Sequence, residues 1–488
     1  MRPTLTPSAV ILIFILFGRV PLYSQISPRL DEAPCRVPIP EGVKAVCYDL
    51  RVRESRSVAN GRLISLPVVV IKSLSSTPRP DPVVYTAGGP GVGSFGMVRG
   101  AGNLVPYIQD RDFIIFEQRG TQYAEPSLQC PEVTEALHSN WRQDRTPKAA
   151  RDDELSAVAA CRKRLVDAGV DLGAYNSSES AADLNDLRVT LGLGQWNLYG
   201  ISYSTRLMLN YVRVYPQSVR SVILDSVLPA TANWDETGVD HVLGSLNLLF
   251  NSCKTDTDCS TRYPELESRF YAVVARLENS PVTVNSTVAA KTVPVVIRGH
   301  DFVDLIYNLL ENSRSLAAVP WTIDAVDKGN VEPLKTYAEN NLTSSGFIWG
   351  MRYSVWCGEE MPFQDEKKIS AEVKKYPKLK GFSIQGTFPQ ICRVWNVPSA
   401  KPVENEAVLT NVPLLVFSGE FDPDTPPSWG RLVASWSKHG YFFEVKNTSH
   451  QAMNRRCTFV DIPIAFLNDP GKLPDGKCLA TIEPLKFK

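Results

Sequence analysis

The sequence lacks an excess of charge of either sign. Its 52 Lys and Arg residues balance 52 Asp and Glu residues, so the formal net charge is zero at neutral pH. Proteins that bind nucleic acid normally present a basic field, so we expect no nucleic-acid partner. Hydrophobic residues make up 43% of the chain and charged residues 21%. These values are typical of globular proteins and exclude a disordered chain or a coiled coil.

The sequence also lacks a long apolar run. Beyond the N-terminal segment, no stretch approaches the ~20 apolar residues that span a bilayer. Arg2 precedes a shorter apolar run from Ala9 to Phe17, which is typical of a signal peptide. We expect residues 1–25 to be removed near Ser24 or Gln25, with an uncleaved anchor as the alternative. The mature protein is then secreted or periplasmic, without stable membrane insertion.

Metal-ligand patterns are missing as well. The chain has no C-x-x-C motif and no Cys/His cluster with ligand spacing, so we expect no metal, and nothing implies an organic cofactor. An even number of cysteines in an exported protein predicts disulfides, although sequence alone leaves their connectivity open. We expect neighbouring cysteines to pair. The pairs are Cys35 with Cys47, Cys130 with Cys161, Cys253 with Cys259, Cys357 with Cys392, and Cys457 with Cys478.

Short β-rich runs alternate with helical patterns, which predicts an α/β fold with a mostly parallel sheet covered on both faces. The predicted strands are 82–86, 113–116, 196–199, 222–224, 412–418 and 441–446. Between the fourth and fifth of these, the chain is mainly helical. We therefore predict one α/β domain, residues 26–233 and 402–488, that is interrupted by a helical cap at 234–401.

The segment Gly200-Ile-Ser202-Tyr-Ser204 directly follows a predicted strand and precedes a helical pattern. A serine on such a turn projects its hydroxyl above the sheet, at the positive end of the helix dipole. Ser202 is therefore the candidate nucleophile. The motif departs from G-x-S-x-G because Ser204 replaces the last glycine, where a small residue is needed for close packing.

A glycine-rich segment, Ala87-Gly-Gly89-Pro-Gly91, follows the strand at 82–86. Glycines allow backbone N–H groups to turn toward a developing negative charge, so this segment is a candidate oxyanion loop. No Gly-Lys-[ST] follows it, which excludes a phosphate loop.

An acid and a histidine follow the last two predicted strands. Asp422 comes after the strand 412–418, and His450 comes after the strand 441–446, which is the Ser, Asp, His order of the α/β-hydrolases. We take Asp422 as the orienting acid and His450 as the general base. Asp424, Glu420 and Asp225 are the alternative acids.

With these elements in place, the chain resembles the proline iminopeptidase and tripeptidyl-aminopeptidase-like group of α/β-hydrolases. The sequence Glu117-Gln-Arg-Gly120 is similar to that group's D-Q-R-G, and Cys253 to Leu266 is similar to a cysteine and Tyr-Pro stretch in the cap of the tripeptidyl branch. Trp356 to Glu359 and the Cys457 and Cys478 pair also match. Ala87 stands where iminopeptidases usually carry His.

The resemblance implies an α/β-hydrolase fold and a serine exopeptidase that acts on peptide N-termini. It implies that the backbone N–H groups of Gly89 and Tyr203 bind the oxyanion. Cap acids would neutralise the substrate's free amine, and Glu359 and Glu360 are the candidates. A secreted carboxylesterase that acts on small esters is the alternative enzyme. A binding protein on a hydrolase scaffold is the alternative of another class, and the oligomeric state is left open.

Overall fold

The computed structural model describes residues 27–143, 145–288, 290–344, 346–382 and 389–488. The predicted signal peptide, residues 1–25, lies outside these ranges. Among the described residues, no helix combines the length and the apolar character needed to cross a bilayer.

The core is a nine-stranded sheet with strand order β1-β2-β3-β5-β4-β6-β7-β10-β11. Six strands of this sheet are parallel to one another: β5, β4, β6, β7, β10 and β11. At one edge, β1, β2 and β3 pair antiparallel, and β3 is antiparallel to β5. The bounds are Arg29–Glu32 (β1), Ala45–Arg53 (β2), Leu63–Ile71 (β3), Val83–Thr86 (β4), Phe113–Phe116 (β5), Trp196–Ile201 (β6), Val219–Asp225 (β7), Leu414–Gly419 (β10) and Gly440–Val445 (β11). This architecture confirms the predicted fold class.

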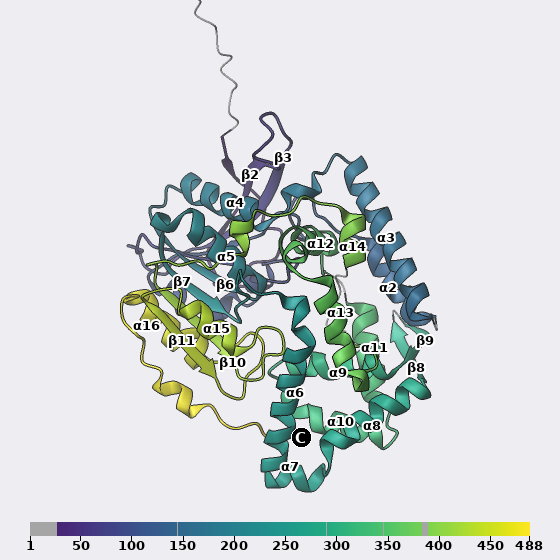
Figure 1. The fold of residues 1–488 in the computed structure, drawn as a ribbon. Coiled ribbons are helices and arrows are strands. Elements are labelled where there is room, and N and C mark those ends of the chain that lie inside the picture. Colours follow the sequence, from purple (N-terminus) through teal and green to yellow (C-terminus); the bar gives the residue numbers. More distant parts are fainter. Residues whose placement is uncertain (1–26, 144, 289, 345, 383–388) are drawn as a thin grey trace, which may run out of the picture.

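Helices cover both faces of the parallel strands (Figure 1). In β10, Leu414 and Val416 pack on one face, and Leu415 and Phe417 pack on the other. Both faces are buried, which is why these strands read as continuous apolar runs rather than as alternating patterns. One face carries α4 (Ser177–Thr190), α5 (Tyr203–Val214) and α15 (Pro427–Ala434), and the other carries α1 (Gly96–Arg99) and α16 (Ile462–Asn468).

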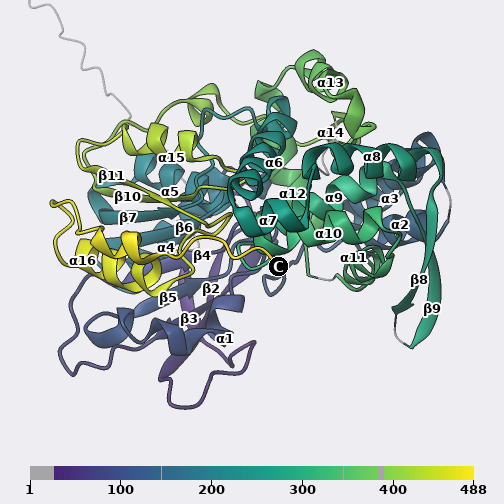
Figure 2. The ribbon, with the colours of Figure 1, turned by 90° about the horizontal axis from the view of Figure 1, so that it is seen from below.

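The segment between β7 and β10 is the helical cap, which lies beside the sheet (Figure 2). Its helices are α6 (Gly238–Thr255), α7 (Thr257–Arg262), α8 (Leu266–Asn279), α9 (Gly299–Glu311), α10 (Val319–Asp327), α11 (Glu332–Thr343), α12 (Trp349–Val355), α13 (Glu366–Lys375) and α14 (Pro389–Trp395). The cap also contains a hairpin that the sequence analysis did not predict, β8 (Val282–Val288) and β9 (Lys291–Ile297).

A second excursion contributes to the cap. Helices α2 (Pro131–Arg142) and α3 (Pro147–Asp167) leave the core between β5 and α4. Helix α3 packs against α14, and α2 packs against β9. The cap is therefore assembled from two segments that lie far apart in the sequence.

Five disulfides join the same cysteines that neighbour each other along the chain. The described residues include no free cysteine. Cys357–Cys392 joins the end of α12 to α14, and Cys130–Cys161 joins α2 to α3. Each disulfide thus closes a local loop within one part of the fold.

Arg119, which lies just after β5, is fully buried among polar partners. Its guanidinium donates to both carboxylate oxygens of Asp183, each at 2.7 Å, and to the carbonyl oxygens of Glu54 and Ala174, each at 2.5 Å. These contacts fasten the N-terminal strands and α4 to the loop after β5. Arg119 therefore braces the core.

Replacing Arg119 with Met should destabilise the fold. The substitution leaves Asp183 with one cation partner, Arg56, and removes the donors for two buried carbonyls. We expect the free energy of unfolding to fall by about 3–5 kcal/mol in urea titrations under non-reducing conditions.

Arg393→Met is the matched control because Arg393 pairs with Glu366 on the surface, where both side chains are more than half exposed. That variant should change stability by less than about 1 kcal/mol. Equal effects of the two substitutions would contradict the bracing role of Arg119.

Candidate active site

Ser202 lies on the sharp turn between β6 and α5, with φ 55° and ψ −130°. A positive φ is strained for a residue that carries a Cβ, and such strain persists only where the surrounding structure holds it. Here the Ser202 N–H donates to the carbonyl oxygen of Asp225 at the end of β7, at 2.9 Å. Ser202 therefore has the backbone geometry of a nucleophile elbow.

Ser204, the residue that replaces the usual glycine, has a structural reason to be serine. Its side chain is fully buried, and its Oγ accepts a hydrogen bond from the Ile201 N–H at 2.7 Å. The same hydroxyl donates to the carbonyl oxygen of Thr86 at the end of β4, at 2.8 Å. Ser204 thus joins the elbow to the strand that precedes the glycine-rich loop.

His450 and Asp422 form a buried hydrogen-bonded pair. The His450 Nδ1 lies 2.9 Å from Asp422 Oδ2, and the Thr425 hydroxyl donates to the same carboxylate oxygen at 2.7 Å. The backbone N–H groups of Asp424 and Thr425 donate to Asp422 Oδ1. Burial raises the pKa of Asp422, but His450 and these donors together hold it below its ordinary value.

The three alternative acids have other partners. The Asp225 carboxylate accepts the backbone N–H groups of Ala452 and Met453, and Glu420 accepts from Lys446 and from the Asn447 N–H. Asp424 accepts from the Tyr307 hydroxyl at 2.8 Å. Of the four acids, the structure hydrogen-bonds Asp422 to the imidazole.

The structure brings the serine turn and the histidine loop together through Asp225. The carbonyl oxygen of Asp225 holds the Ser202 N–H, and its carboxylate holds the chain just after His450. Among the described residues, the Ser202 hydroxyl has no hydrogen bond to His450. In unliganded hydrolases this contact commonly tightens only when substrate is bound.

The loop that contains Gly88 and Gly89 lies directly against the serine turn. A Cβ at Gly88 would lie 2.8 Å from the Ser202 Cβ and 3.3 Å from the Tyr203 nitrogen, so only glycine fits. Gly89 has φ 109°, a conformation that favours glycine. The two segments that carry the predicted oxyanion donors, Gly89 and Tyr203, are therefore in contact.

The cap holds this loop from above. Arg352 of α12 donates to the Gly89 carbonyl oxygen at 3.1 Å, and the Ile348 N–H donates to the Gly91 carbonyl oxygen at 3.0 Å. The Arg352 guanidinium lies 3.6 Å from the ring centroid of Trp356, a cation–π contact that orients it. The position of the loop thus depends on the cap.

The core holds the same loop from below. Glu117 accepts the Ser94 N–H at 2.7 Å, and the Gln118 side-chain amide donates to the Ala87 carbonyl oxygen at 2.6 Å. Burial raises the pKa of Glu117 to about 7. Glu117 and Gln118 belong to the E-Q-R-G segment, so this segment positions the glycine-rich loop.

Glu359 and Glu360, the predicted amine-binding acids, are buried and already have protein partners. Glu359 accepts the N–H and the hydroxyl of Ser177 at 2.5 and 2.6 Å, and Glu360 pairs with Arg206 of α5. Burial raises the pKa of both carboxyls to about 7. A substrate amine at these acids would have to displace Ser177 or Arg206.

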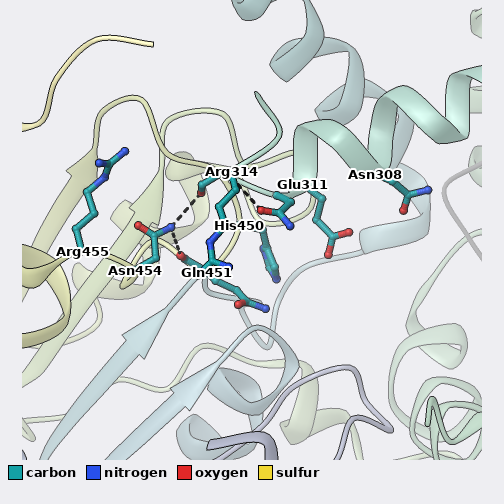
Figure 3. Close-up of a pocket in the computed structure, with 9 residues that line it drawn as sticks. Asn308, Glu311, Arg314, His450, Gln451, Asn454 and Arg455 are labelled. Carbon is teal, nitrogen blue, oxygen red and sulfur yellow. Dashed lines mark hydrogen bonds between the residues drawn. The ribbon is translucent and has the colours of Figure 1, made fainter. Parts of the chain in front are cut away.

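A cavity of about 580 Å³ opens beside His450, and the Glu311 side chain of α9 lies next to the imidazole (Figure 3). Its lining residues are Asn308, Glu311, Asn312, Ser313, Arg314, His450, Gln451, Asn454 and Arg455. One carboxylate oxygen each of Glu311 and Asp424 and one ring nitrogen of His450 lie within 4.8 Å of one another. A cation at this point would take the ring nitrogen that a general base needs.

These acids change the titration of the histidine. Burial lowers the pKa of His450, but Asp422, Asp424 and Glu311 together raise it to about 10. Burial and the neighbouring Glu311 raise the pKa of Asp424 to about 7. The cleft next to the base therefore favours a positive charge.

Sequence reasoning missed three residues of this site. Thr425 lies within the Asp422 loop and could have been found as the hydroxyl that directly follows the Asp422-Pro-Asp424 turn. Arg352 and Glu311 come from the cap, and no local motif marks either residue as part of the site.

The model of the alpha/beta hydrolase fold family matches residues 81–453. The serine protease Hip1 of Mycobacterium tuberculosis is 23% identical over 490 residues, which cover 93% of this chain and 92% of that protein. A tripeptidyl aminopeptidase of Streptomyces lividans is 27% identical over 138 residues, 27% of this chain and 25% of that one. The structure of a proline iminopeptidase from Mycobacterium smegmatis covers 87% of this chain and 98% of its own, with 12% identity and a TM-score of 0.40.

Activity should rise with pH well above neutrality. A general base must be unprotonated, and the raised pKa of His450 keeps the free enzyme's imidazole protonated at pH 7. Glu311→Gln removes one of the charges that favour the imidazolium. We expect the midpoint of the kcat/KM profile, measured with an uncharged ester, to move down by about one pH unit.

Glu420→Gln is the control because Glu420 is a nearby acid whose partners are Lys446 and the Asn447 N–H. Its profile should match that of the unchanged enzyme. An unchanged or higher midpoint in Glu311→Gln would contradict the electrostatic account.

Proposed function

The chain belongs to the α/β-hydrolase fold family and is a serine hydrolase, and we propose that it is an exported exopeptidase that releases residues from peptide N-termini. The observation that carries this proposal is the buried His450–Asp422 pair, held by Asp225 next to the elbow of Ser202. The glycine-rich loop lies against that elbow, where an oxyanion would form.

The proposed reaction is acyl transfer. His450 takes the proton of the Ser202 hydroxyl, whose oxygen attacks the substrate carbonyl. The backbone N–H groups of Gly89 and Tyr203 stabilise the oxyanion, and Asp422 stabilises the imidazolium. His450 then protonates the leaving amine, and a water molecule activated by the same imidazole hydrolyses the acyl-enzyme.

Two observations support a peptide with a free amine as the substrate. Glu311 and Asp424 place carboxylates beside His450, where they would attract an ammonium group. The relatives named above include a serine protease and a tripeptidyl aminopeptidase. A secreted carboxylesterase is the second candidate because the same groups hydrolyse esters.

Five disulfides support export. Such bonds persist in oxidising compartments and are rare in a reducing cytosol. Together with the predicted signal peptide at 1–25, they favour a secreted or periplasmic location.

Ser202→Ala should abolish hydrolysis while leaving the fold intact. Loss of the nucleophile typically lowers kcat by at least about 10³-fold. A fluorophosphonate should label the unchanged protein and not this variant, because only an activated serine reacts readily. Ser435→Ala, at an exposed serine after α15, is the control and should be labelled normally. Undiminished turnover in Ser202→Ala would overturn the assignment, and an unlabelled parent protein would favour a non-catalytic binding protein.

A substrate panel tests exopeptidase action against esterase action. We expect efficient hydrolysis of peptidyl amides with a free N-terminus and a loss of at least tenfold in kcat/KM when the amine is acetylated. The physical reason is that acetylation removes the positive charge that the cleft acids favour. Hydrolysis of 4-nitrophenyl esters alone, without release from any amide, would identify an esterase.

A further inference from the structure

Glu359, a predicted amine-binding acid, is joined through Ser177 to the residue that follows the nucleophile. Its carboxylate oxygens accept the N–H and the hydroxyl of Ser177, at 2.5 and 2.6 Å. Because the Ser177 hydroxyl hydrogen is donated to this carboxylate, its oxygen accepts from the Tyr203 hydroxyl, which lies 2.8 Å away. We call these three side chains the Glu359–Ser177–Tyr203 chain. It runs from the cap to the start of α5.

The chain lies in the interior of the molecule. Glu359, Ser177 and Tyr203 are each 1% exposed. Ser177 is the first residue of α4, and this helix packs against α5, which begins at Tyr203. A buried polar group that loses its partner is costly, so the chain holds the Tyr203 ring in one position.

The same cap segment holds α5 at a second point. Arg206 lies three residues after Tyr203, so both side chains leave one face of the helix. The Arg206 guanidinium pairs with Glu360 and donates to the Glu359 carbonyl oxygen at 3.1 Å. Both acids belong to a π-helix, Trp356–Glu360, and such irregular turns occur frequently at functional sites. The first turn of α5 is therefore attached to the cap at two points.

This turn of α5 carries the predicted oxyanion donor, the Tyr203 N–H. The nitrogen directly follows Ser202, and the glycine-rich loop packs against it, since a Cβ at Gly88 would lie 3.3 Å away. Loss of one preorganised donor from an oxyanion hole lowers kcat by about 10²–10³-fold. A small rotation of the Tyr203 peptide should therefore lower the rate of the chemical step.

On the basis of the proposed role of Tyr203 as an oxyanion donor, we propose that Glu359 is a positioning residue for the oxyanion hole rather than a binding site for the substrate amine. It orients Tyr203 through the hydroxyl of Ser177. The cap then fixes both sides of the oxyanion hole: Arg352 holds the carbonyl of Gly89, and Glu359 holds the helix turn that supplies the second donor.

Tyr203→Phe and Glu359→Gln test this role because each removes one member of the chain and keeps the shape of the side chain. The probe is 4-nitrophenyl acetate, an uncharged ester whose cleavage does not depend on recognition of a peptide amine. Active enzyme is counted by complete labelling with a fluorescent fluorophosphonate, so a folding defect does not enter the rate. We expect kcat to fall at least about tenfold in each variant. KM should stay within about twofold, because the lost interaction acts in the transition state.

The double variant Tyr203→Phe/Glu359→Gln tests whether the two residues act through one chain. Its kcat should be close to that of the less active single variant, because the second substitution breaks a chain that is already broken. Multiplied losses would overturn the chain as the route of the effect. An unchanged kcat, or a raised KM at unchanged kcat, in Glu359→Gln would overturn the positioning role.

Tyr211→Phe and Glu372→Gln are the matched controls. Tyr211 is a buried tyrosine of the same helix, and its hydroxyl lies 2.8 Å from that of Ser218, which reproduces the bond removed in Tyr203→Phe. Glu372 is a buried cap acid that accepts the Asp240 N–H at 3.0 Å and whose pKa burial raises to about 7. Both controls should keep kcat per active enzyme within about twofold of the unchanged protein.

The outcomes separate the positioning role from the proposed function. Full kcat in both Tyr203→Phe and Glu359→Gln, with an active and labelled parent protein, would overturn the positioning role alone. Equal losses in the controls would overturn it as well, because the effect would then belong to any buried polar group. A parent protein that neither cleaves the ester nor reacts with the fluorophosphonate would overturn both.

Discussion

The buried carboxylate of Asp225 is the contact on which the arrangement of the site depends. The backbone carbonyl of Asp225 accepts a hydrogen bond from the serine turn, and its carboxylate accepts two from the backbone just after His450. A neighbouring constraint acts at Gly419, where a Cβ would lie 2.1 Å from the Ser449 carbonyl oxygen. The acid strand and the histidine loop can therefore pack together only if residue 419 lacks a side chain. These contacts explain why the ends of β6, β7, β10 and β11 converge at one edge of the sheet.

The cap helps to position the glycine-rich loop next to Ser202, in addition to covering the site. Arg352 and Ile348 fix the glycine-rich loop from above, while Glu117 and Gln118 fix it from below. Backbone donors stabilise an oxyanion effectively only when they are held in place before the reaction. A change in the cap that moves this loop should therefore lower the rate of the chemical step as well as weaken substrate binding.

The acids around His450 have opposing effects on the proposed reaction. They keep the imidazole of the free enzyme protonated, which suppresses the base, yet they favour a cationic substrate. A bound ammonium group in the cleft would offset part of their charge and lower the pKa of His450 toward the working range. The charge that selects the substrate would thus also make the base available when that substrate is present.

The sequence alone determined the features that are local in the chain: the parallel strands, the serine turn after β6, the glycine-rich loop after β4, and the order of Ser202, Asp422 and His450. Each follows from a short pattern whose physical cause lies within a few residues. The antiparallel edge strands β1 to β3, the hairpin β8–β9 and the contribution of α2 and α3 to the cap were not predicted, because long-range pairing and docking create them. Only the tertiary structure decided that Asp225 joins two loops and that Glu359 and Glu360 are paired with Ser177 and Arg206. The same holds for Glu311, which lines the cavity beside His450, and for Arg352, which holds the Gly89 carbonyl. Charges and hydrogen bonds act across space, and residues that meet at one point of a fold need share no pattern along the chain.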